Sequence, residues 1–398
     1  MASSASPNVR PEKRLLLRCA RTQLSPALAQ EIRELAASPM DWDYLLADAA
    51  QHSLRPLLAR HLSGCAAEIV PPAALKRLTD GVRTNTGRCL ILTAELIRIM
   101  DRFHEAGIPA VPYKGPVTAV QAYGDVTLRE FEDLDIVLPQ RDMLRANGIV
   151  VGLGYSARFP WILSPDAASA LVPGEYNYRD EARRILIELH TERTLRHFPV
   201  APDLDDLARN LVPISFSGHE IRTFAPEDAL VMLCIHGSKD FWQKISWVVD
   251  IAELVRACPA LDWDAAYRRA DSWNARRILH LGLGLACGML DARLLDEIDA
   301  RVNGDQASAA LASEVMRWLL DGDQCALGSA GRFSFRRRML KGALAGWRYS
   351  IRLAVVPAEE DWEMVRLPGR LAPLYVALRP LRLLRKYGWR GGDSRESA

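Results

Sequence analysis

Apolar side chains in the first hundred residues recur at the spacing of one helix face. The longest such run covers residues 73–106 with a period of roughly 3.6 residues, which predicts a single long helix. Gly107 follows this run, and glycine is the residue type that most often ends a helix. We therefore expect a helical region over residues 14–107, preceded by a polar, disordered tail over residues 1–13.

Between residues 108 and 223 the pattern changes to short apolar runs that are typical of strands. Residues 108–113 contain two prolines, which favours a strand at the edge of a sheet. Residues 134–138 form the clearest strand of the chain, and residues 176–178 and 185–189 look like two strands of a meander. These runs predict an α/β or α+β core over residues 108–223, and α+β is the class that we expect for the chain.

The helical period returns at Pro226, where a proline and two acidic residues suit the first turn of a helix. Further helices are expected over residues 247–255, 263–271, 276–290 and 308–320. Ser308 is the expected N-cap of the last one. Together they form a second helical region over residues 224–330, and helical stretches continue in a basic tail over residues 331–398.

The composition is that of a globular protein, with 49% hydrophobic and 25% charged residues in a chain of 398. The seven cysteines include no C-x-x-C pair, which predicts reduced and buried thiols. No apolar run reaches the roughly 18 residues needed to span a bilayer. The polar N-terminus also lacks the apolar segment of a secretory signal. We expect a cytoplasmic protein without a transmembrane segment.

The charge is distributed unevenly, although the formal net charge is only +2. Residues 332–398 contain 15 Lys and Arg against 6 Asp and Glu, so a basic tail follows an acidic body. The amphipathic stretch at residues 378–389 could make a peripheral contact with a membrane surface or bind nucleic acid. Packing of this tail onto the acidic body is the commoner arrangement, and it is the one that we expect.

Two acids at the start of the clearest strand are the main candidates for chemistry. Asp133 and Asp135 lie two residues apart, so both side chains project from the same face of the strand. Carboxylates this close repel each other, and a divalent cation with its preference for oxygen ligands would relieve that repulsion. The alternative is a solvated turn acid followed by an acid that caps the strand.

Further polar residues stand near the predicted strands. Lys114 and Gly115 lie between a strand and a helix, where backbone amides and a lysine suit a phosphate. Arg129 could hold another phosphate oxygen, or simply pair with the neighbouring Glu130 or Glu132. Glu188 interrupts an apolar strand, and His190 projects from the same face two residues later. A buried carboxylate is costly unless it is paired or bound to a metal, whereas Glu188 on an edge strand would simply face solvent.

In this order the motifs resemble the DNA polymerase β-like nucleotidyltransferase superfamily. Within it, the chain resembles a bacterial family of uncharacterised nucleotidyltransferases, over roughly residues 14–300. The elements that carry the resemblance are Lys114-Gly115, Arg129, Asp133-x-Asp135, Glu188-x-His190 and the segments 226–230, 234–237 and 247–250. The resemblance implies a small mixed sheet with flanking helices, embedded between the N-terminal and C-terminal helical regions.

The resemblance also implies a reaction. A nucleoside monophosphate would pass from an NTP to a small-molecule or peptide acceptor, with release of pyrophosphate and with Mg²⁺ or Mn²⁺ as cofactor. Asp133 and Asp135 would bind two ions, and Glu188 the ion beside the acceptor oxygen. Lys114, Arg129 and the Gly115 amide would neutralise the leaving phosphates. The superfamily usually has Gly-Ser or Gly-Gly in this turn, where the present chain has Lys-Gly-Pro.

Other residues could contact the acceptor or the base. His190, His236, Lys239 and Trp247 are candidates, with Trp242 as an alternative to Trp247 for stacking on a base. A lone histidine such as His236 is more commonly a core or capping residue.

Two other functions remain open: a catalytically weak protein of this fold that binds a nucleotide or a protein partner, and an enzyme that adds nucleotides to nucleic acid. We do not favour nucleic acid as the partner, although the basic tail leaves it open. For the enzyme, we expect Asp135→Asn to abolish metal-dependent transfer while leaving folding intact or slightly improved, because the repulsion from Asp133 is removed.

Overall fold

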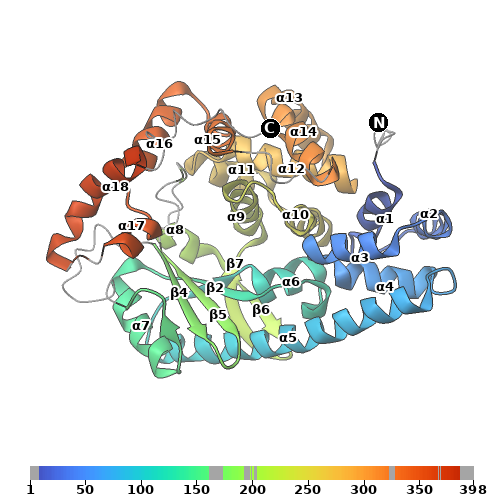
Figure 1. Ribbon diagram of the computed structural model, residues 1–398, viewed down its shortest axis with the longest axis horizontal. Helices are drawn as coiled ribbons and strands as arrows, with labels where there is room; N and C mark the ends of the chain where they lie inside the picture. Colours follow the sequence, from blue (N-terminus) through green and yellow to red (C-terminus); the bar gives the residue numbers. More distant parts are fainter. Residues whose placement is uncertain are drawn as a thin grey trace, which may run out of the picture.

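A computed structural model gives the architecture of the chain and describes residues 9–160, 174–191, 204–321, 328–365 and 369–385, together with residues 198, 200 and 367. The chain folds into a small sheet between helical regions (Figure 1). The core has two parts. One joins the N-terminal helices to the helices that follow the sheet, and the other joins the long helix α5 to the sheet itself.

The N-terminal region consists of five helices. They are α1 (Pro11–Cys19), α2 (Pro26–Ala37), α3 (Trp42–Gln51), α4 (Arg55–Cys65) and α5 (Pro72–Glu105). Helix α5 has 34 residues, confirms the predicted long helix and runs along one side of the sheet (Figure 1). It ends before Gly107, whose positive φ of 64° suits a glycine.

The predicted boundary of the disordered tail at residue 13 is wrong. Helix α1 begins at Pro11, and Lys13 within it is almost fully buried. The Lys13 ammonium lies 2.6 Å from a carboxylate oxygen of Asp48 in α3. The sequence around Lys13 is polar and does not indicate a partner 35 residues away, so its pattern predicted that Lys13 belongs to the tail.

The five-stranded sheet is mixed, which confirms the α+β class. Its strands are β1 (Val111–Tyr113), β2 (Asp133–Val137), β3 (Ser156–Ala157), β4 (Glu175–Asp180) and β5 (Ile185–His190), in the order β1-β2-β5-β4-β3. Strands β2 and β5 are parallel, and the other neighbouring pairs are antiparallel. Strand β1 lies at an edge, as its prolines predict.

Helices and a second hairpin surround this sheet. Helix α6 (Gly115–Tyr123) follows β1, and α7 (Met143–Gly152) follows β2. After the short helix α8 (Leu204–Leu207), strands β6 (Leu211–Phe216) and β7 (His219–Phe224) form a separate two-stranded sheet that was not predicted.

Six helices follow the hairpin, on the other side of the molecule from α5 (Figure 1). They are α9 (Pro226–Lys239), α10 (Ile245–Ala257), α11 (Trp263–Ser272), α12 (Arg276–Leu290), α13 (Asp296–Gly304) and α14 (Gln306–Asp321). Helix α13 was not predicted. The expected N-cap role of Ser308 is wrong: Ser308 lies inside α14, and its backbone N–H donates to the Asp305 carboxylate at 3.1 Å.

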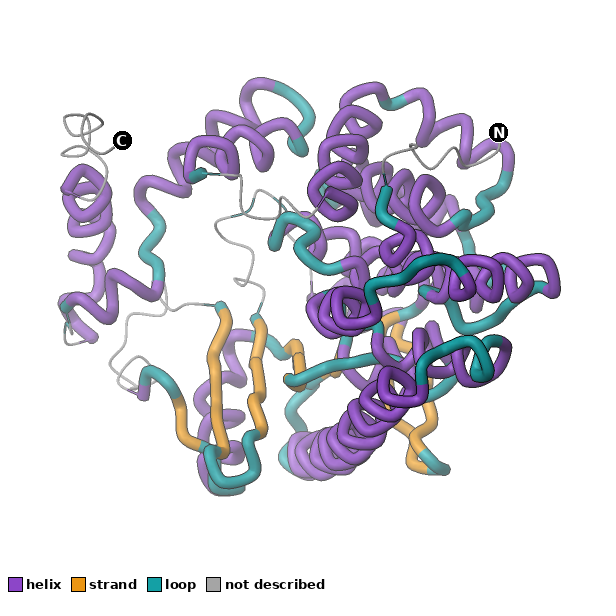
Figure 2. The backbone as a smooth tube through the Cα atoms, turned by 45° about the vertical axis from the view of Figure 1, so that its right-hand side comes forward, coloured by secondary structure: helices purple, strands orange, loops and turns teal. Residues whose placement is uncertain are grey.

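The basic tail is also helical. It contains α15 (Ser329–Arg338), α16 (Ala343–Val355), α17 (Glu359–Met364) and α18 (Tyr375–Leu383). In Figures 1 and 2 these helices form an arc at the edge of the molecule, on the side away from α1–α4. No helix within the described part of the chain combines the length and the apolarity needed to cross a membrane.

The cysteines partly match their prediction. Cys19, Cys89 and Cys234 are buried free thiols, whereas Cys65, Cys258 and Cys287 are free but only partly buried. The seventh, Cys325, lies outside the described residues.

Candidate active site

Neighbouring strands bring the predicted acids together. Strands β2 and β5 run parallel with Asp135 directly opposite Glu188. His190 lies two residues beyond Glu188 on the same face of β5. One ligand atom from each of Asp135, Glu188 and His190 lies within 4.8 Å of the other two. The parallel register therefore builds a set of two carboxylates and one imidazole from segments about 50 residues apart in the chain.

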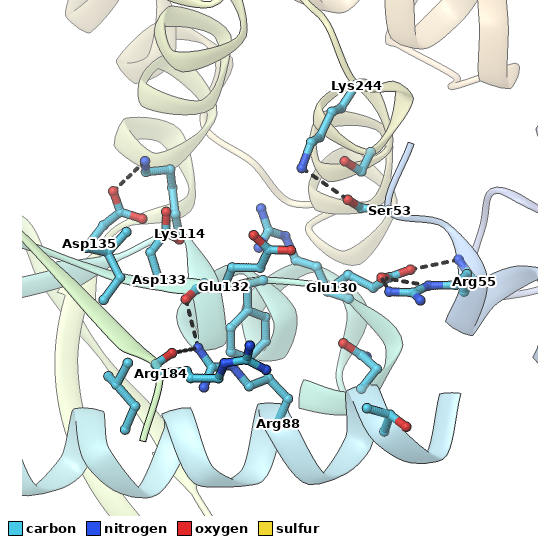
Figure 3. A pocket seen from close by; sticks show the side chains of 18 of the residues that line it. Ser53, Arg55, Arg88, Lys114, Glu130, Glu132, Asp133, Asp135, Arg184 and Lys244 are labelled. Carbon is cyan, nitrogen blue, oxygen red and sulfur yellow. Dashed lines mark hydrogen bonds and ion pairs between the residues drawn. The ribbon is translucent and has the colours of Figure 1, made fainter. Parts of the chain in front are cut away.

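The turn after β1 adds a cation to this set. The Lys114 ammonium lies 2.5 Å from Asp135 Oδ1 (Figure 3), and the Lys114 side chain is only 11% exposed. Lys114 has φ 55° and ψ −155°, close to a backbone region that is essentially restricted to glycine. Gly115 follows with φ 42°, and a Cβ there would lie 3.3 Å from the Asp133 carbonyl oxygen. A strained turn thus lies tightly against β2 and directs a lysine at its acid.

The charges of this cluster do not balance. Burial alone would raise the pKa of Asp135, but the Lys114 ammonium and the hydrogen bond with His190 outweigh burial and lower that pKa well below its usual range. Burial raises the pKa of Asp133, and the Asp135 carboxylate raises it further. Burial also raises the pKa of Glu188, with added repulsion from Asp135 and Glu175. The site therefore holds more carboxylates than its cations neutralise.

A divalent cation fits this donor set. The residues supply carboxylate oxygens and an imidazole nitrogen within reach of one ion, and an ion would offset the repulsion that, after burial, raises the pKa values of Asp133 and Glu188. Asp135 and Glu188 are the ligands that the geometry favours most, with His190 beside them. Asp133 lies on the same face of β2 but is not part of the close group of three.

His190 lies among the ligand atoms rather than at the rim of the site. Its Nε2 is 2.9 Å from Asp135 Oδ1 and 3.5 Å from Glu188 Oε2. Its Nδ1 is 3.9 Å from Glu175 Oε2, and Lys239 donates to that same oxygen at 3.2 Å. Lys239 is thus linked to the cluster through Glu175, a residue that the sequence analysis missed. Only the antiparallel pairing of β4 with β5, which places Glu175 opposite His190, brings this acid to the site.

Arg129 lies in the wall of the site and has a buried partner. Its guanidinium donates two hydrogen bonds of 2.8 Å to the two carboxylate oxygens of Asp250 in α10. The Tyr123 hydroxyl donates to the same carboxylate at 2.7 Å. The alternative pairing of Arg129 with Glu130 or Glu132 is wrong, because Glu130 binds the Arg55 guanidinium instead. The role of Arg129 as a phosphate ligand remains a prediction.

Helices α9 and α10 contribute aromatic groups. The rings of His236 and Trp247 meet edge to face with centroids 4.9 Å apart. Burial, together with the Lys114 ammonium, lowers the pKa of His236 well below its ordinary value, so its imidazole is neutral. Trp242 is fully buried, and a Cβ on Gly237 would lie 2.5 Å from its ring. The predicted stacking of Trp242 on a base is therefore wrong. Trp247, by contrast, lines an open cavity.

That cavity has a volume of about 740 Å³ and opens beside the acids (Figure 3). Its walls come from the loop before α4, from α5, from the turns after β1 and before β2, from the β4–β5 turn, and from α9 and α10. Side chains of both charges line it. The basic ones are Arg55, Arg88, Lys114, Arg129, Arg179, Arg184 and Lys244.

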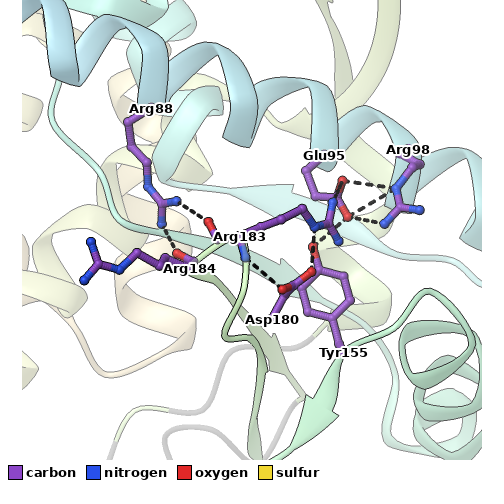
Figure 4. Close-up of polar contacts among 7 residues, drawn as sticks. All are labelled: Arg88, Glu95, Arg98, Tyr155, Asp180, Arg183 and Arg184. Carbon is purple, nitrogen blue, oxygen red and sulfur yellow. Dashed lines mark hydrogen bonds and ion pairs between the residues drawn. The ribbon is translucent and has the colours of Figure 1, made fainter.

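The β4–β5 turn is fixed to α5 by hydrogen bonds. Arg88 donates to the carbonyl oxygens of Arg183 and Arg184 (Figure 4). Glu95, about two helix turns further along α5, accepts from the Arg183 guanidinium at 3.0 Å and from the Tyr155 hydroxyl at 2.6 Å. These contacts hold one wall of the cavity in place. The Arg184 side chain lines this wall and has no partner among the described residues.

The comparisons with known proteins agree with this arrangement. A family model described as uncharacterised nucleotidyltransferase matches residues 38–291, well over half of the chain. The matched segment contains β1 to β7 and every site residue described above. No curated protein matches the chain.

Proposed function

The chain belongs to this family of uncharacterised nucleotidyltransferases, and we propose that it transfers a nucleoside monophosphate from an NTP to a small-molecule or peptide acceptor with release of pyrophosphate. One observation carries the proposal: Asp135, Glu188 and His190 converge next to a lysine–glycine turn, and this turn and Asp135 line a cavity. Carboxylates for a metal ion and a cationic turn for phosphates are the groups that phosphoryl chemistry needs.

We propose Mg²⁺ or Mn²⁺ as the cofactor, held by Asp135 and Glu188 and supported by Asp133. Such an ion polarises phosphoryl oxygens and makes a bound hydroxyl a better nucleophile. His190 can hold the Asp135 carboxylate in place, because its Nε2 is already at 2.9 Å. Glu188, whose pKa is raised by burial and by the neighbouring carboxylates, is suited to take a proton from the acceptor hydroxyl.

The turn at Lys114 would bind the phosphates. Once a cation takes over the negative charge of Asp135, the Lys114 ammonium becomes available to a phosphate oxygen. The Gly115 amide lies at the N-terminus of α6, where backbone N–H groups favour anions, and the missing Cβ leaves room for a close approach. The cavity beside the turn, with Trp247 and His236 in its wall, would hold the base or the acceptor.

A second candidate is a protein that binds a nucleotide or a partner with little or no turnover. The direct Lys114–Asp135 pair favours it, because the acid is then neutralised without a metal ion. The Lys-Gly-Pro sequence of the turn also replaces the Gly-Ser or Gly-Gly that is usual in the superfamily. The two candidates differ in turnover and not in nucleotide binding.

We also propose a cytoplasmic location. The six described cysteines are free thiols, which is the usual state in a reducing compartment.

The test is incubation of the full chain with each α-³²P-labelled NTP, with Mg²⁺, with Mn²⁺ or with EDTA. Label should move to an acceptor pool or to the protein only when metal is present, and Asp135→Asn should abolish the transfer. Asp299→Asn, an exposed acid on α13 far from the site in sequence and in fold, is the matched control and should transfer normally. Metal-linked nucleotide binding without any transfer would support the second candidate, and no binding with any NTP would refute both.

A further inference from the structure

We propose that the outward face of α16 and α18 is a docking surface for an anionic phospholipid membrane. The face is defined by Leu344, Trp347 and Ile351 of α16 and by Leu374, Leu381 and Leu384 in and around α18. This inference is independent of the proposed reaction, since none of these residues lies in the candidate active site.

Helix α16 exposes an apolar stripe. Leu344, Trp347 and Ile351 stand at positions i, i+3 and i+7, so they share one side of the helix. Their exposed fractions are 74%, 69% and 52%. Tyr349, on the opposite side, is 1% exposed. Helix α16 therefore packs against the protein with the side that carries Tyr349. The side that carries Leu344, Trp347 and Ile351 faces outward.

Helix α18 repeats this arrangement. Leu374, Leu381 and Leu384 follow one another at intervals of seven and three residues, and all are at least half exposed. The inward side carries Tyr375 and Arg379, which are buried. Helices α16 and α18 pack against each other, so the two exposed stripes lie on neighbouring helices.

Exposed apolar side chains are concentrated in this part of the chain. Of the fourteen large hydrophobic residues that are exposed among the described residues, nine lie between Leu344 and Leu384. Soluble proteins rarely leave such groups clustered unless the surface meets a partner or a membrane. The described contacts between the tail and the body come from α15 and α17, through the Arg336 bond to the Lys239 carbonyl and the Arg158–Glu363 ion pair. Arg379 and Arg382 of α18 bind Asp361 within the tail, so packing of the 378–389 stretch on the body remains a prediction. Among the described residues, these contacts leave the apolar side chains of α16 and α18 exposed.

The charge around the face favours an anionic surface. The segment from residue 332 onward has 15 Lys and Arg and 6 Asp and Glu. Two of its acids have partners within the described residues: Asp361 is buried and binds Arg379 and Arg382, and Glu363 pairs with Arg158. Arg348 beside Trp347 and Arg385 beside Leu384, by contrast, are exposed, whereas Arg379 and Arg382 are occupied by Asp361. Each such residue gains attraction near anionic lipids.

Apolar and basic groups together distinguish a membrane from the other occupants. Nucleic acid would need the arginines but not exposed leucines and a tryptophan on the same side. A second copy of the chain would meet this face with its own, and the exposed arginines of the two copies, Arg348 and Arg385, would then repel each other. A bilayer interface suits the aliphatic residues, the tryptophan and the arginines together. Leucine and isoleucine enter the acyl boundary, tryptophan prefers the interfacial layer, and arginine reaches the headgroups.

The test is co-sedimentation of the full chain with phosphatidylcholine vesicles, with and without phosphatidylglycerol. We expect binding only to the vesicles that contain phosphatidylglycerol, and we expect that binding to weaken as salt is raised. The double variant Leu344→Gln, Trp347→Gln should bind at least about tenfold more weakly, as should Leu381→Gln, Leu384→Gln. Leu295→Gln is the matched control, because Leu295 is 53% exposed but precedes α13.

The variants alter exposed residues, so circular dichroism melts should match the wild type and exclude misfolding as the cause. Equal sedimentation with both vesicle types, or unchanged binding by both double variants, would overturn the proposal. A dimer in light scattering that Leu344→Gln, Trp347→Gln dissociates would replace the membrane with a second copy as the occupant. Retention on duplex DNA that outcompetes the vesicles would assign the basic face to nucleic acid instead.

Discussion

Replacing Asp135 with asparagine should destabilise the metal-free protein strongly. Asp135 is 3% exposed, and its carboxylate is the counter-charge of the Lys114 ammonium at 2.5 Å. The substitution keeps the shape but leaves that ammonium buried without its partner. Breaking a buried ion pair from one side costs about 3–5 kcal/mol, and the lost charge-assisted bond with His190 at 2.9 Å acts in the same direction. We therefore expect a loss of about 4 kcal/mol in the free energy of unfolding.

This expectation reverses the one drawn from the sequence. The sequence indicated only the repulsion between Asp133 and Asp135. Removing that repulsion with asparagine at 135 was therefore expected to leave stability unchanged or slightly higher. The repulsion is present, since the pKa of Asp133 is raised by burial and by Asp135. The attraction of Lys114 outweighs it, because that attraction and the His190 bond overcome burial and lower the pKa of Asp135.

Asp133→Asn is the matched control, made in the same strand two residues earlier. Asp133 has no ion pair among the described residues, and its raised pKa means that its environment already disfavours the charge. Asparagine at 133 should change stability by no more than about 1 kcal/mol, or improve it slightly. Both variants should lose nucleotide transfer, so stability separates the roles of the two acids while activity does not.

The assay is urea unfolding in EDTA, followed by far-ultraviolet circular dichroism. Asp135→Asn should lower the midpoint markedly, and adding Lys114→Met to it should restore most of the loss without restoring transfer, because the unpaired ammonium is then gone. The reasoning fails if Asp135→Asn unfolds at the wild-type midpoint, or if the double variant is no more stable than the single one.

Three further outcomes follow from buried groups. Asp250→Ala should cost about 3–5 kcal/mol in urea unfolding, because Arg129 keeps a buried charge without its bidentate partner; an unchanged midpoint would contradict this. Gly237→Ala should cost about 1–3 kcal/mol in the same assay, since a Cβ would lie 2.5 Å from the Trp242 ring, and a neutral result would show that the ring can move. Burial lowers the pKa of His52 to about 3, so only the unfolded state takes up its proton below about pH 6.5. Stability should fall by roughly 2 kcal/mol from this group between pH 6.5 and 5, and His52→Gln should flatten the measured slope in that window.

The sequence predicted the elements that build the site because their patterns are local. Strand β2 is an apolar run with acids at its start, and α5 is a long run of helical spacing that ends at Gly107. Glu188 could be singled out because a carboxylate interrupts an apolar strand. The family resemblance implied a metal site shared by Asp133, Asp135 and Glu188, and the parallel register of β2 and β5 places Asp135 opposite Glu188.

The partners of these residues could not be predicted, because each comes from a distant segment. Arg129 and Asp250 are 121 residues apart, and their pairing depends on how α10 packs against α6. Glu175 joins Lys239 only because β4 pairs with β5 while α9 lies over the same end of the sheet. Hydrophobic spacing indicates which face of an element is buried, but it does not indicate which charge on another element will meet it.

The Lys114–Asp135 pair connects the metal and nucleotide steps of the proposed reaction. In the protein alone the ammonium occupies the place of a counter-cation, and it is held there by a backbone conformation that is costly for a lysine. If Asp135 binds the metal as proposed, a free ion would have to displace this ammonium, whereas a metal–NTP complex would supply a cation for Asp135 and a phosphate for Lys114 at the same time. The exchange then leaves neither charge unpaired. On this basis the metal and the nucleotide should enter together, and the strain at Lys114 keeps the lysine close enough to serve both partners.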